Sequence, residues 1–161
     1  MKRCIQIGFL SAALLGLGAA PIVPPHVPRP YEEDSKAYVL KALTLAGQPG
    51  APYADGLLVI APGGALNEQQ RALLEARATA LIEAFRETDS REIKLRALMA
   101  MSNGGLFAPA DVRTQLADLG AEICSSSNDG QMVTYGVKLI SLSPQGKHVD
   151  PLMTSITRDD Y

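Results

Sequence analysis

The chain has 161 residues, of which 47% are hydrophobic, and its 15 Lys and Arg are balanced by 17 Asp and Glu to a net charge of -2. It lacks the basic cluster that neutralises nucleic-acid phosphates, so no nucleic-acid partner is expected. About 130 residues follow the proline-rich segment, enough for one domain with its own core.

The N-terminal segment has the pattern of an export signal. Two basic residues precede an uncharged, mostly apolar stretch from Cys4 to Pro25, which predicts a signal peptide or an N-terminal transmembrane anchor over residues 1–20. Cleavage after Gly18 fits the need for small residues at the cut. If retained, residues 5–23 approach the ~20 apolar residues that cross a bilayer. A buried helix of a soluble protein is the third interpretation.

Prolines dominate residues 21–31, which predicts a stiff, extended spacer. The domain is then expected over residues 32–143, followed by a polar C-terminal tail over residues 144–161. Both the cleaved and the anchored interpretation place this domain outside the cytoplasm, in the periplasm or exported, either free or anchored in the inner membrane through the N-terminal segment.

The first half of the domain predicts two helices separated by a strand. Apolar residues at helical spacing favour a helix over 35–46, and the short apolar run 57–62 between turn residues favours a buried strand. Asn67 with Gln70 three residues later is a capping-box pattern for a long helix that ends near Glu87.

The second half predicts three further strands and one helix. Residues 91–101 fit both a helix and an alternating strand, and their context favours the strand. Pro109 is a typical start for a helix that Gly120 would end. Short apolar runs at 121–124 and within 133–143 favour two more strands.

Alternating strands and helices predict the fold class α/β: a single small domain with a mostly parallel sheet of about four strands, flanked by helices. Residues 57–70 and 98–111 share one plan of apolar strand, Gly-Gly, apolar residue and helix start. Two such copies are too few for a solenoid.

In such a sheet, ligands bind at the carboxyl ends of the strands. Glycine-rich and serine-rich loops follow three of the predicted strands and would meet at one edge, where backbone amides can approach a ligand. The alternative is that the glycines serve ordinary turns that need positive φ. No nucleotide fingerprint and no cofactor is expected. The candidate ligand-binding residues are Gly63, Gly64, Asn103, Gly104, Gly105, Ser125 and Ser126.

Cys124 is the candidate catalytic residue. The segment "LADLGAEICSSSNDG", followed by "YGVKLISLS", resembles the DsrE/DsrF-like α/β proteins, and this resemblance implies a sulfur-accepting persulfide site at Cys124. Independently, a thiol at a strand end beside a helix N-terminus can supply a nucleophilic thiolate. The alternative is a β-hairpin through "SNDG", in which Cys124 only lines the core.

His148 and Asp150 could supply a general base or a metal ligand. His26 is the only other histidine, and a zinc site usually has three or four protein ligands. No metal site is therefore expected.

These patterns predict a bacterial envelope domain, exported and either free or membrane-tethered, that binds a protein partner or a small ligand without catalysis. One alternative is a thiol or sulfur carrier that uses Cys124. Another is a structural subunit of an envelope assembly, with self-association into a homo-oligomer as a further expectation.

Overall fold

The computed structural model describes residues 35–60 and 65–157, and in these ranges the chain forms helices, turns and loops without any strand. The predicted α/β fold with its parallel sheet is therefore wrong. The expectations for residues 1–31 lie outside the described residues. The helices are α1 (Ser35–Thr44), α2 (Glu68–Glu87), α3 (Arg91–Gly104), α4 (Ala110–Ser126), α5 (Gly130–Ile140) and α6 (Val149–Thr157), with 3-10 turns η1 (Ala54–Gly56), η2 (Gly105–Phe107) and η3 (Gly146–His148).

The predicted helix starts are confirmed. The Gln70 amide donates to Asn67 Oδ1 at 2.8 Å, and the Asn67 amide donates to Gln70 Oε1 at 3.0 Å, which is the reciprocal capping box at the start of α2. Helix α4 begins directly after Pro109. Local capping chemistry is thus sufficient to locate these N-termini.

The predicted strand over 91–101 is helix α3. Ser90 caps it, accepting from the Ile93 amide at 3.4 Å, and the buried residues Ala97, Leu98 and Met101 follow helical spacing. Their packing against α2 and α5 selects the helical period, because the same apolar residues also alternate.

The predicted strand over 57–62 is also wrong within its described part. Leu57 follows the turn η1 and is held there by Arg77 of α2, whose Nη1 donates to the Leu57 carbonyl at 3.1 Å. A carbonyl that bonds a side chain in this way needs no strand ladder.

Gly120 does not end a helix. It lies inside α4, which continues to Ser126 and absorbs the strand predicted over 121–124, while the strand predicted within 133–143 is largely α5. A Cβ at Gly120 would lie 2.5 Å from the Gly136 carbonyl oxygen of α5. The glycine permits close approach of α4 and α5. It therefore serves tertiary packing, although in the sequence it resembles a residue that ends a helix.

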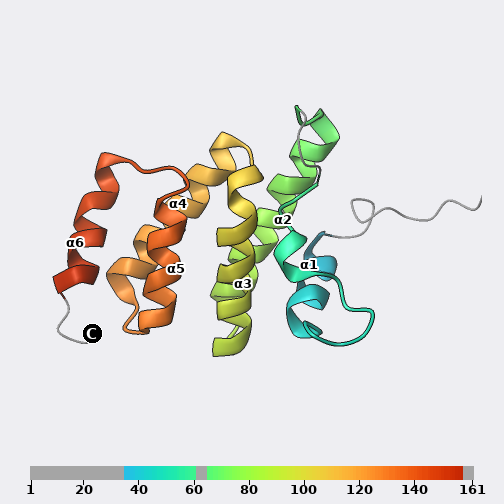
Figure 1. Ribbon diagram of the computed structural model, residues 1–161, viewed down its shortest axis with the longest axis horizontal. Coiled ribbons are helices and arrows are strands. Elements are labelled where there is room, and N and C mark those ends of the chain that lie inside the picture. The colour runs from blue at the N-terminus through green and yellow to red at the C-terminus, as the bar shows by residue number, and fades with distance from the viewer. Residues whose placement is uncertain (1–34, 61–64, 158–161) are drawn as a thin grey trace, which may run out of the picture.

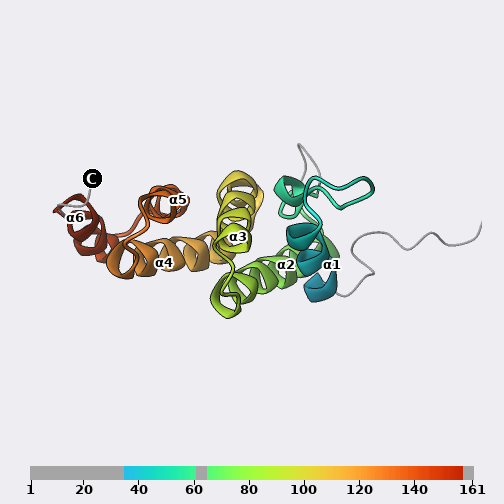
Figure 2. The same cartoon turned by 90° about the horizontal axis from the view of Figure 1, so that it is seen from below.

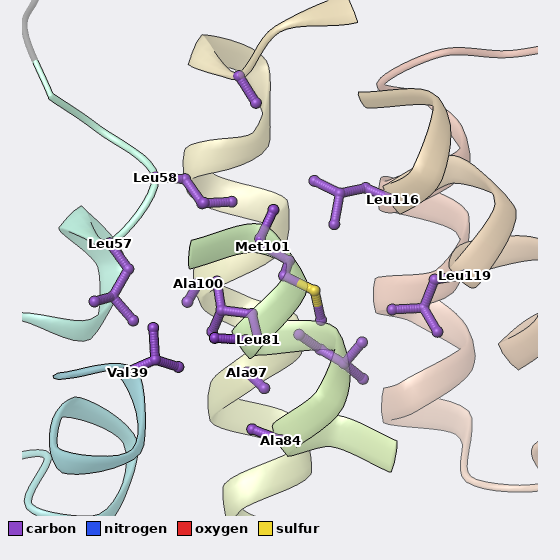
Figure 3. Close-up of a cluster of buried hydrophobic side chains, with 14 of the residues drawn as sticks. Val39, Leu57, Leu58, Leu81, Ala84, Ala97, Ala100, Met101, Leu116 and Leu119 are labelled. Atoms are coloured by element: carbon purple, nitrogen blue, oxygen red, sulfur yellow. The ribbon is translucent and has the colours of Figure 1, made fainter. Parts of the chain in front are cut away.

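Successive helices run up and down (Figure 1), with α1 and α6 at opposite ends of the molecule. Seen from below, α2 and α4 form one row and α3 and α5 a second row (Figure 2). One apolar core cluster combines Leu81, Met101 and Leu116 of the two rows with Val39 of α1 and Leu58 (Figure 3). Fully buried leucines and small alanines fill this space.

The two rows are built from two matching helical hairpins, α2–α3 and α4–α5. Each hairpin turns through three residues, and in each the first hydroxyl accepts from the amide of the next helix's N-cap residue: Thr88 Oγ1 from Ser90, and Ser127 Oγ from Asp129, both at 3.1 Å. The N-cap residues Ser90 and Asp129 are 39 residues apart.

Burial follows the same 39-residue register along both hairpins. Matched positions are buried in both, namely Leu73 and Val112, Arg77 and Leu116, Ala78 and Ala117, Ala80 and Leu119, Leu81 and Gly120, Ala84 and Ile123, Ala97 and Gly136, Ala100 and Leu139, and Met101 and Ile140. The molecule thus contains two stacked helical hairpins of one plan, fewer than the three units that a solenoid needs. This repeat replaces the predicted one, which paired residues 57–70 with 98–111.

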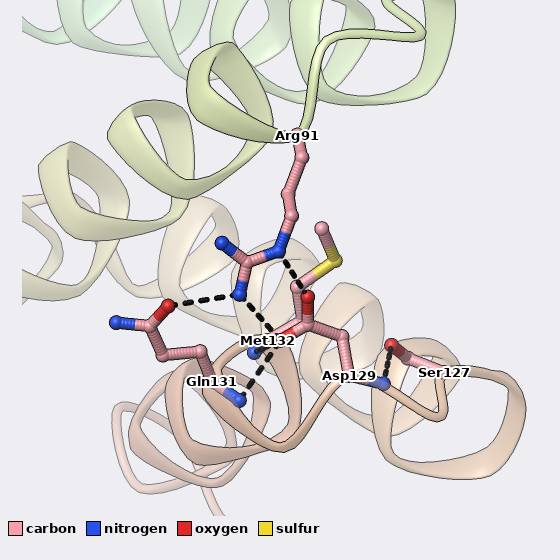
Figure 4. Close-up of polar contacts among 5 residues, drawn as sticks. All are labelled: Arg91, Ser127, Asp129, Gln131 and Met132. Carbon is pink, nitrogen blue, oxygen red and sulfur yellow. Dashed lines mark hydrogen bonds and ion pairs between the residues drawn. The ribbon is translucent and has the colours of Figure 1, made fainter.

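A polar contact joins the two turns (Figure 4). Arg91, the first residue of α3, donates from Nε to Asp129 Oδ2 at 2.6 Å and from Nη2 to Gln131 at 3.0 Å. Asp129 also accepts from the amides of Gln131 and Met132 as the cap of α5. The Arg91 guanidinium lowers the pKa of the Asp129 carboxyl. Equivalent ends of the two hairpins are therefore held side by side.

Candidate binding groove

An open groove of about 420 Å³ separates α2 from α4. Two facing pairs in its walls are register-matched positions of the two helices: Thr79 matches Asp118, and Glu83 matches Glu122. The groove therefore follows from stacking the two hairpins. Its lining residues are Thr79, Ile82, Glu83 and Arg86 of α2, and Gln115, Asp118, Leu119 and Glu122 of α4.

Ion pairs line both walls. Arg86 Nη2 lies 2.6 Å from Glu122 Oε2 and so bridges the groove. Lys36 of α1 donates to Glu83 Oε2 at 3.0 Å, and this carboxylate raises the pKa of Lys36. These side chains are about half exposed, so each pair contributes little to stability and is available to a ligand.

Asp118 anchors the C-terminal segment to the groove wall. Its Oδ1 accepts from Lys147 Nζ at 2.5 Å and lies 2.9 Å from His148 Nε2. The Lys147 hydrogen bond, followed by that of His148, lowers the pKa of Asp118.

His148 is 2% exposed, and its Nδ1 accepts from the Gln145 amide at 3.2 Å. This bond assigns the proton to Nε2, which donates to Asp118. Both ring nitrogens are engaged, so His148 fastens η3 to α4 instead of offering a base beside Asp150.

The groove combines charged side chains at its rims with a small apolar lining. This lining is Ile82, which is partly buried, together with Leu119, which is 2% exposed. Such a surface can bury apolar side chains of a polypeptide while the rims pair with its polar groups. In the described ranges, no group of three or more His, Cys, Asp and Glu side chains could hold a metal ion.

The predicted ligand-binding residues do not form one cluster. Asn103, Gly104 and Gly105 lie at the end of α3, whereas Ser125 and Ser126 lie at the end of α4. Because α3 and α4 run in opposite directions, these ends are at opposite edges of the molecule (Figure 1). Gly63 and Gly64 lie outside the described residues.

Each of these groups has a local role. A Cβ at Gly104 would lie 2.7 Å from Leu58 Cβ, so this glycine permits close packing, and its φ of -89° needs no glycine. Ser125 and Ser126 donate their hydroxyls to backbone carbonyls one turn back, at 2.9 and 2.8 Å. These hydroxyls serve the end of α4.

Cys124 is fully buried inside α4, at the contact with α5. Its Sγ lies 3.9 Å from the Val133 carbonyl oxygen, and a Cβ at Gly136 would approach the sulfur to 3.0 Å. A reagent would therefore reach this thiol only after α4 and α5 separate.

Sequence reasoning missed the groove because its residues look like ordinary solvated faces of two separate helices. Arg86 and Glu122 are 36 residues apart and meet only through packing. The tripeptides "TDS" at 88–90 and "SND" at 127–129 were the available signal, since each combines a hydroxyl with an N-cap residue.

No helix in the ranges 35–60 and 65–157 is long and apolar enough to cross a membrane. Comparisons with protein-family models, curated proteins and solved structures found no match to this chain. The fold and the groove are therefore interpreted from their own geometry.

Proposed function

We propose that the protein is a non-catalytic binding module that receives a segment of a partner protein in the groove between α2 and α4. One observation carries this proposal: α2 and α4, the first helices of two stacked hairpins, form the groove walls, as in helical arrays whose stacked units create binding surfaces. Its size is within the range of ligand sites. The exposed ion pairs at its rims favour a polypeptide of mixed charge.

We also propose that the module works in the bacterial envelope. The basic residues before an uncharged apolar stretch, and the proline-rich spacer after it, support export. The intact mass of the native protein tests this proposal. Loss of about 18 residues indicates cleavage, a full-length chain in the membrane fraction indicates an anchor, and a full-length chain confined to the cytoplasm contradicts export.

A photo-crosslinking experiment tests the groove. Benzoylphenylalanine replaces Thr79, which is exposed in the groove, and in a control protein it replaces Thr134, which is exposed on α5. We expect a defined protein adduct from position 79 alone. The second variant, Gln115→Arg, fills the groove from an exposed site and should abolish the adduct while leaving the circular dichroism spectrum unchanged.

Equal labelling from positions 79 and 134 would contradict the proposal, as would an adduct that persists in Gln115→Arg. The spectrum guards against a false result, because loss of the adduct together with loss of helicity reports misfolding. In that case Gln115→Lys, which is shorter, repeats the test.

A further inference from the structure

A second cavity, the α3–α5 groove, lies between the two helices of the second row (Figure 2). Its volume is about 340 Å³. The apolar part of its lining is Leu95 and Met99 of α3 together with Tyr135 of α5, and all three side chains are partly exposed. Because α3 and α5 pack on each other, these side chains form one apolar surface that contains an aromatic ring.

The polar side chains of the α3–α5 groove already have partners. Arg91 donates to Gln131 at 3.0 Å (Figure 4). Arg96 donates to the Leu43 carbonyl at 2.7 Å and to Glu92. An occupant therefore gains most by burying apolar surface, and it leaves fewer donors unsatisfied if its own backbone has few N–H groups. Proline is the residue without a backbone N–H.

A neighbouring cavity of about 490 Å³ enlarges this surface. Met99 lines both cavities. The loop between α1 and η1 forms the other wall of the second cavity and includes Tyr53, which is 75% exposed. One tyrosine thus lines each cavity, and Met99 is common to both. Grooves lined by aromatic rings are the surfaces that bind proline-rich segments in the polyproline II conformation.

Residues 21–30 have the composition and the period of such a segment. Five of these ten residues are prolines. Polyproline II has three residues per turn, so residues three apart lie on one edge. Positions 21, 24, 27 and 30 are Pro, Pro, Val and Pro, and positions 22, 25 and 28 are Ile, Pro and Pro. Both polar residues, His26 and Arg29, belong to the third edge. In this conformation the segment would have two apolar edges and one edge with its polar residues.

We propose that residues 21–30 of this chain bind the α3–α5 groove and the cavity beside it as a polyproline II helix. The two apolar edges contact Tyr135, Met99 and Tyr53, and the edge with His26 and Arg29 faces water. The contact holds the helical domain in a fixed orientation to the N-terminal segment. This inference does not depend on the proposed function, because it concerns a different groove.

The length of the chain permits this contact within one molecule. Residues 31–34 connect the segment to Ser35, and four extended residues span about 13 Å. Ser35 lies about 12 Å along α1 from Leu43, whose carbonyl accepts from Arg96 in the groove wall. A tethered segment within reach of a groove has an effective concentration on the order of 1 mM, which favours it over a free segment of another protein.

Photo-crosslinking in the full chain, purified in detergent, tests the contact. Benzoylphenylalanine replaces Tyr135 in the groove, and in the control it replaces the exposed Thr134, which does not line it. Mass spectrometry should find residues 21–30 joined to position 135 and not to position 134. Gln131, an exposed residue of the same groove, is the second labelling position if the change at Tyr135 lowers helicity. Residues 21–30 remain in the chain whether or not the segment up to Gly18 is removed.

Two neighbouring substitutions test the proposed edges. Val27→Glu places a charge on an apolar edge, whereas His26→Glu places the same residue on the polar edge. Val27→Glu should lower the crosslink yield about tenfold or more, and His26→Glu should change it by less than about twofold. Both positions precede Ser35, the first residue of α1, so the helical circular dichroism of both variants should match that of the wild type.

A mixture of ¹⁵N-labelled and unlabelled chains distinguishes contacts within one molecule from contacts between copies. We expect both halves of each crosslink to carry the same label. Four outcomes overturn the inference: no crosslink to residues 21–30 from positions 135 and 131, equal crosslinking from position 134, crosslinks of mixed label, or equal losses in Val27→Glu and His26→Glu. Gln115→Arg in the groove between α2 and α4 should leave the crosslink intact, so failure here is distinguishable from failure of the proposed function.

Discussion

At the scale of single residues, the contact between α4 and α5 depends on glycines, which have no side chain to collide with the facing helix. Gly120 and Gly136 let α4 and α5 approach until a Cβ at Gly120 would lie 2.5 Å from a backbone oxygen. A backbone oxygen cannot move aside as a flexible side chain can. The same contact encloses Cys124. The close approach of α4 and α5 at these two glycines therefore also explains why the thiol is buried.

Gly120→Ala should therefore destabilise the protein by about 1–3 kcal/mol, as overpacked interiors do. This loss is expected although alanine is favoured over glycine inside a helix by about 1 kcal/mol. Urea unfolding measures it. Gly146→Ala, in the 3-10 turn η3, is the control for added volume, because no heavy atom beyond its own chain neighbours lies within 4 Å of its Cβ position. An unchanged midpoint for Gly120→Ala would contradict the close α4–α5 contact.

Asp118 should make stability depend on pH at the acidic end. Its pKa is lowered in the folded protein by Lys147 and His148, so the carboxylate stabilises the fold above the ordinary carboxyl pKa of 3.8. That contribution disappears as the pH falls through the lower folded value. The difference in unfolding free energy between wild type and Asp118→Asn should therefore be largest near neutral pH.

The difference should shrink as the pH drops below 3.8, and it should also shrink in high salt because Asp118 is about half exposed. Urea titrations at a series of pH values measure both trends. A difference that grows on acidification would show that Asp118 has no stabilising contact with the C-terminal segment.

At the scale of elements, matched positions in the two hairpins have different energetic roles. Leu98 and Val137 occupy the same register in α3 and α5, yet one is fully buried and the other 42% exposed. The difference comes from the surroundings of the two helices, because α3 packs against α1, α2, η1 and α5, whereas α5 packs against α3 and α4. The neighbouring elements therefore determine burial at this position, because the register is the same in both helices.

Leu98→Ala should cost about 2–5 kcal/mol, as truncations in packed cores do. Val137→Ala should cost less than about 0.5 kcal/mol because much of its side chain is in water. Thermal and urea unfolding of both variants measure the two losses. Comparable losses would contradict the exposure of Val137 at the surface of α5.

At the scale of the whole molecule, stability should fall toward the α6 end. Residues from α1 to α5 share one large apolar cluster. Among residues 35–60 and 65–157, the apolar cluster that α6 joins is a small second one, of Cys124, Val133 and Ile140, which Leu152 contacts. In an array whose units contact only their neighbours, an end with few apolar contacts opens before the centre.

Native-state hydrogen exchange should therefore show the least protected helical amides in α6 and the most protected in α2 and α4. Leu152→Ala should speed exchange in α6. It should change the free energy of global unfolding, measured in urea, by no more than about 0.5 kcal/mol. If α6 exchanges only through global unfolding, the proposed gradient along the array is wrong.

The starts of several helices could be predicted from the sequence. The capping box at Asn67 and Gln70 and the helix start at Pro109 were predicted and confirmed, because each depends on hydrogen bonds and backbone angles within a few residues. The helix predicted over 35–46 is also present, as α1 (Ser35–Thr44). The sequence by itself thus determined where these helices begin and how their apolar faces repeat.

Only the tertiary structure decided the fold class and the site. Residues 91–101 fit both the helical and the strand period of apolar residues. Gly120 resembles a helix end in the sequence, and only its contact with Gly136 of α5 shows that it serves packing. The groove pairs Arg86 with Glu122 across 36 residues. Each of these features depends on which helix is the neighbour, and no local spacing in the chain encodes that neighbour.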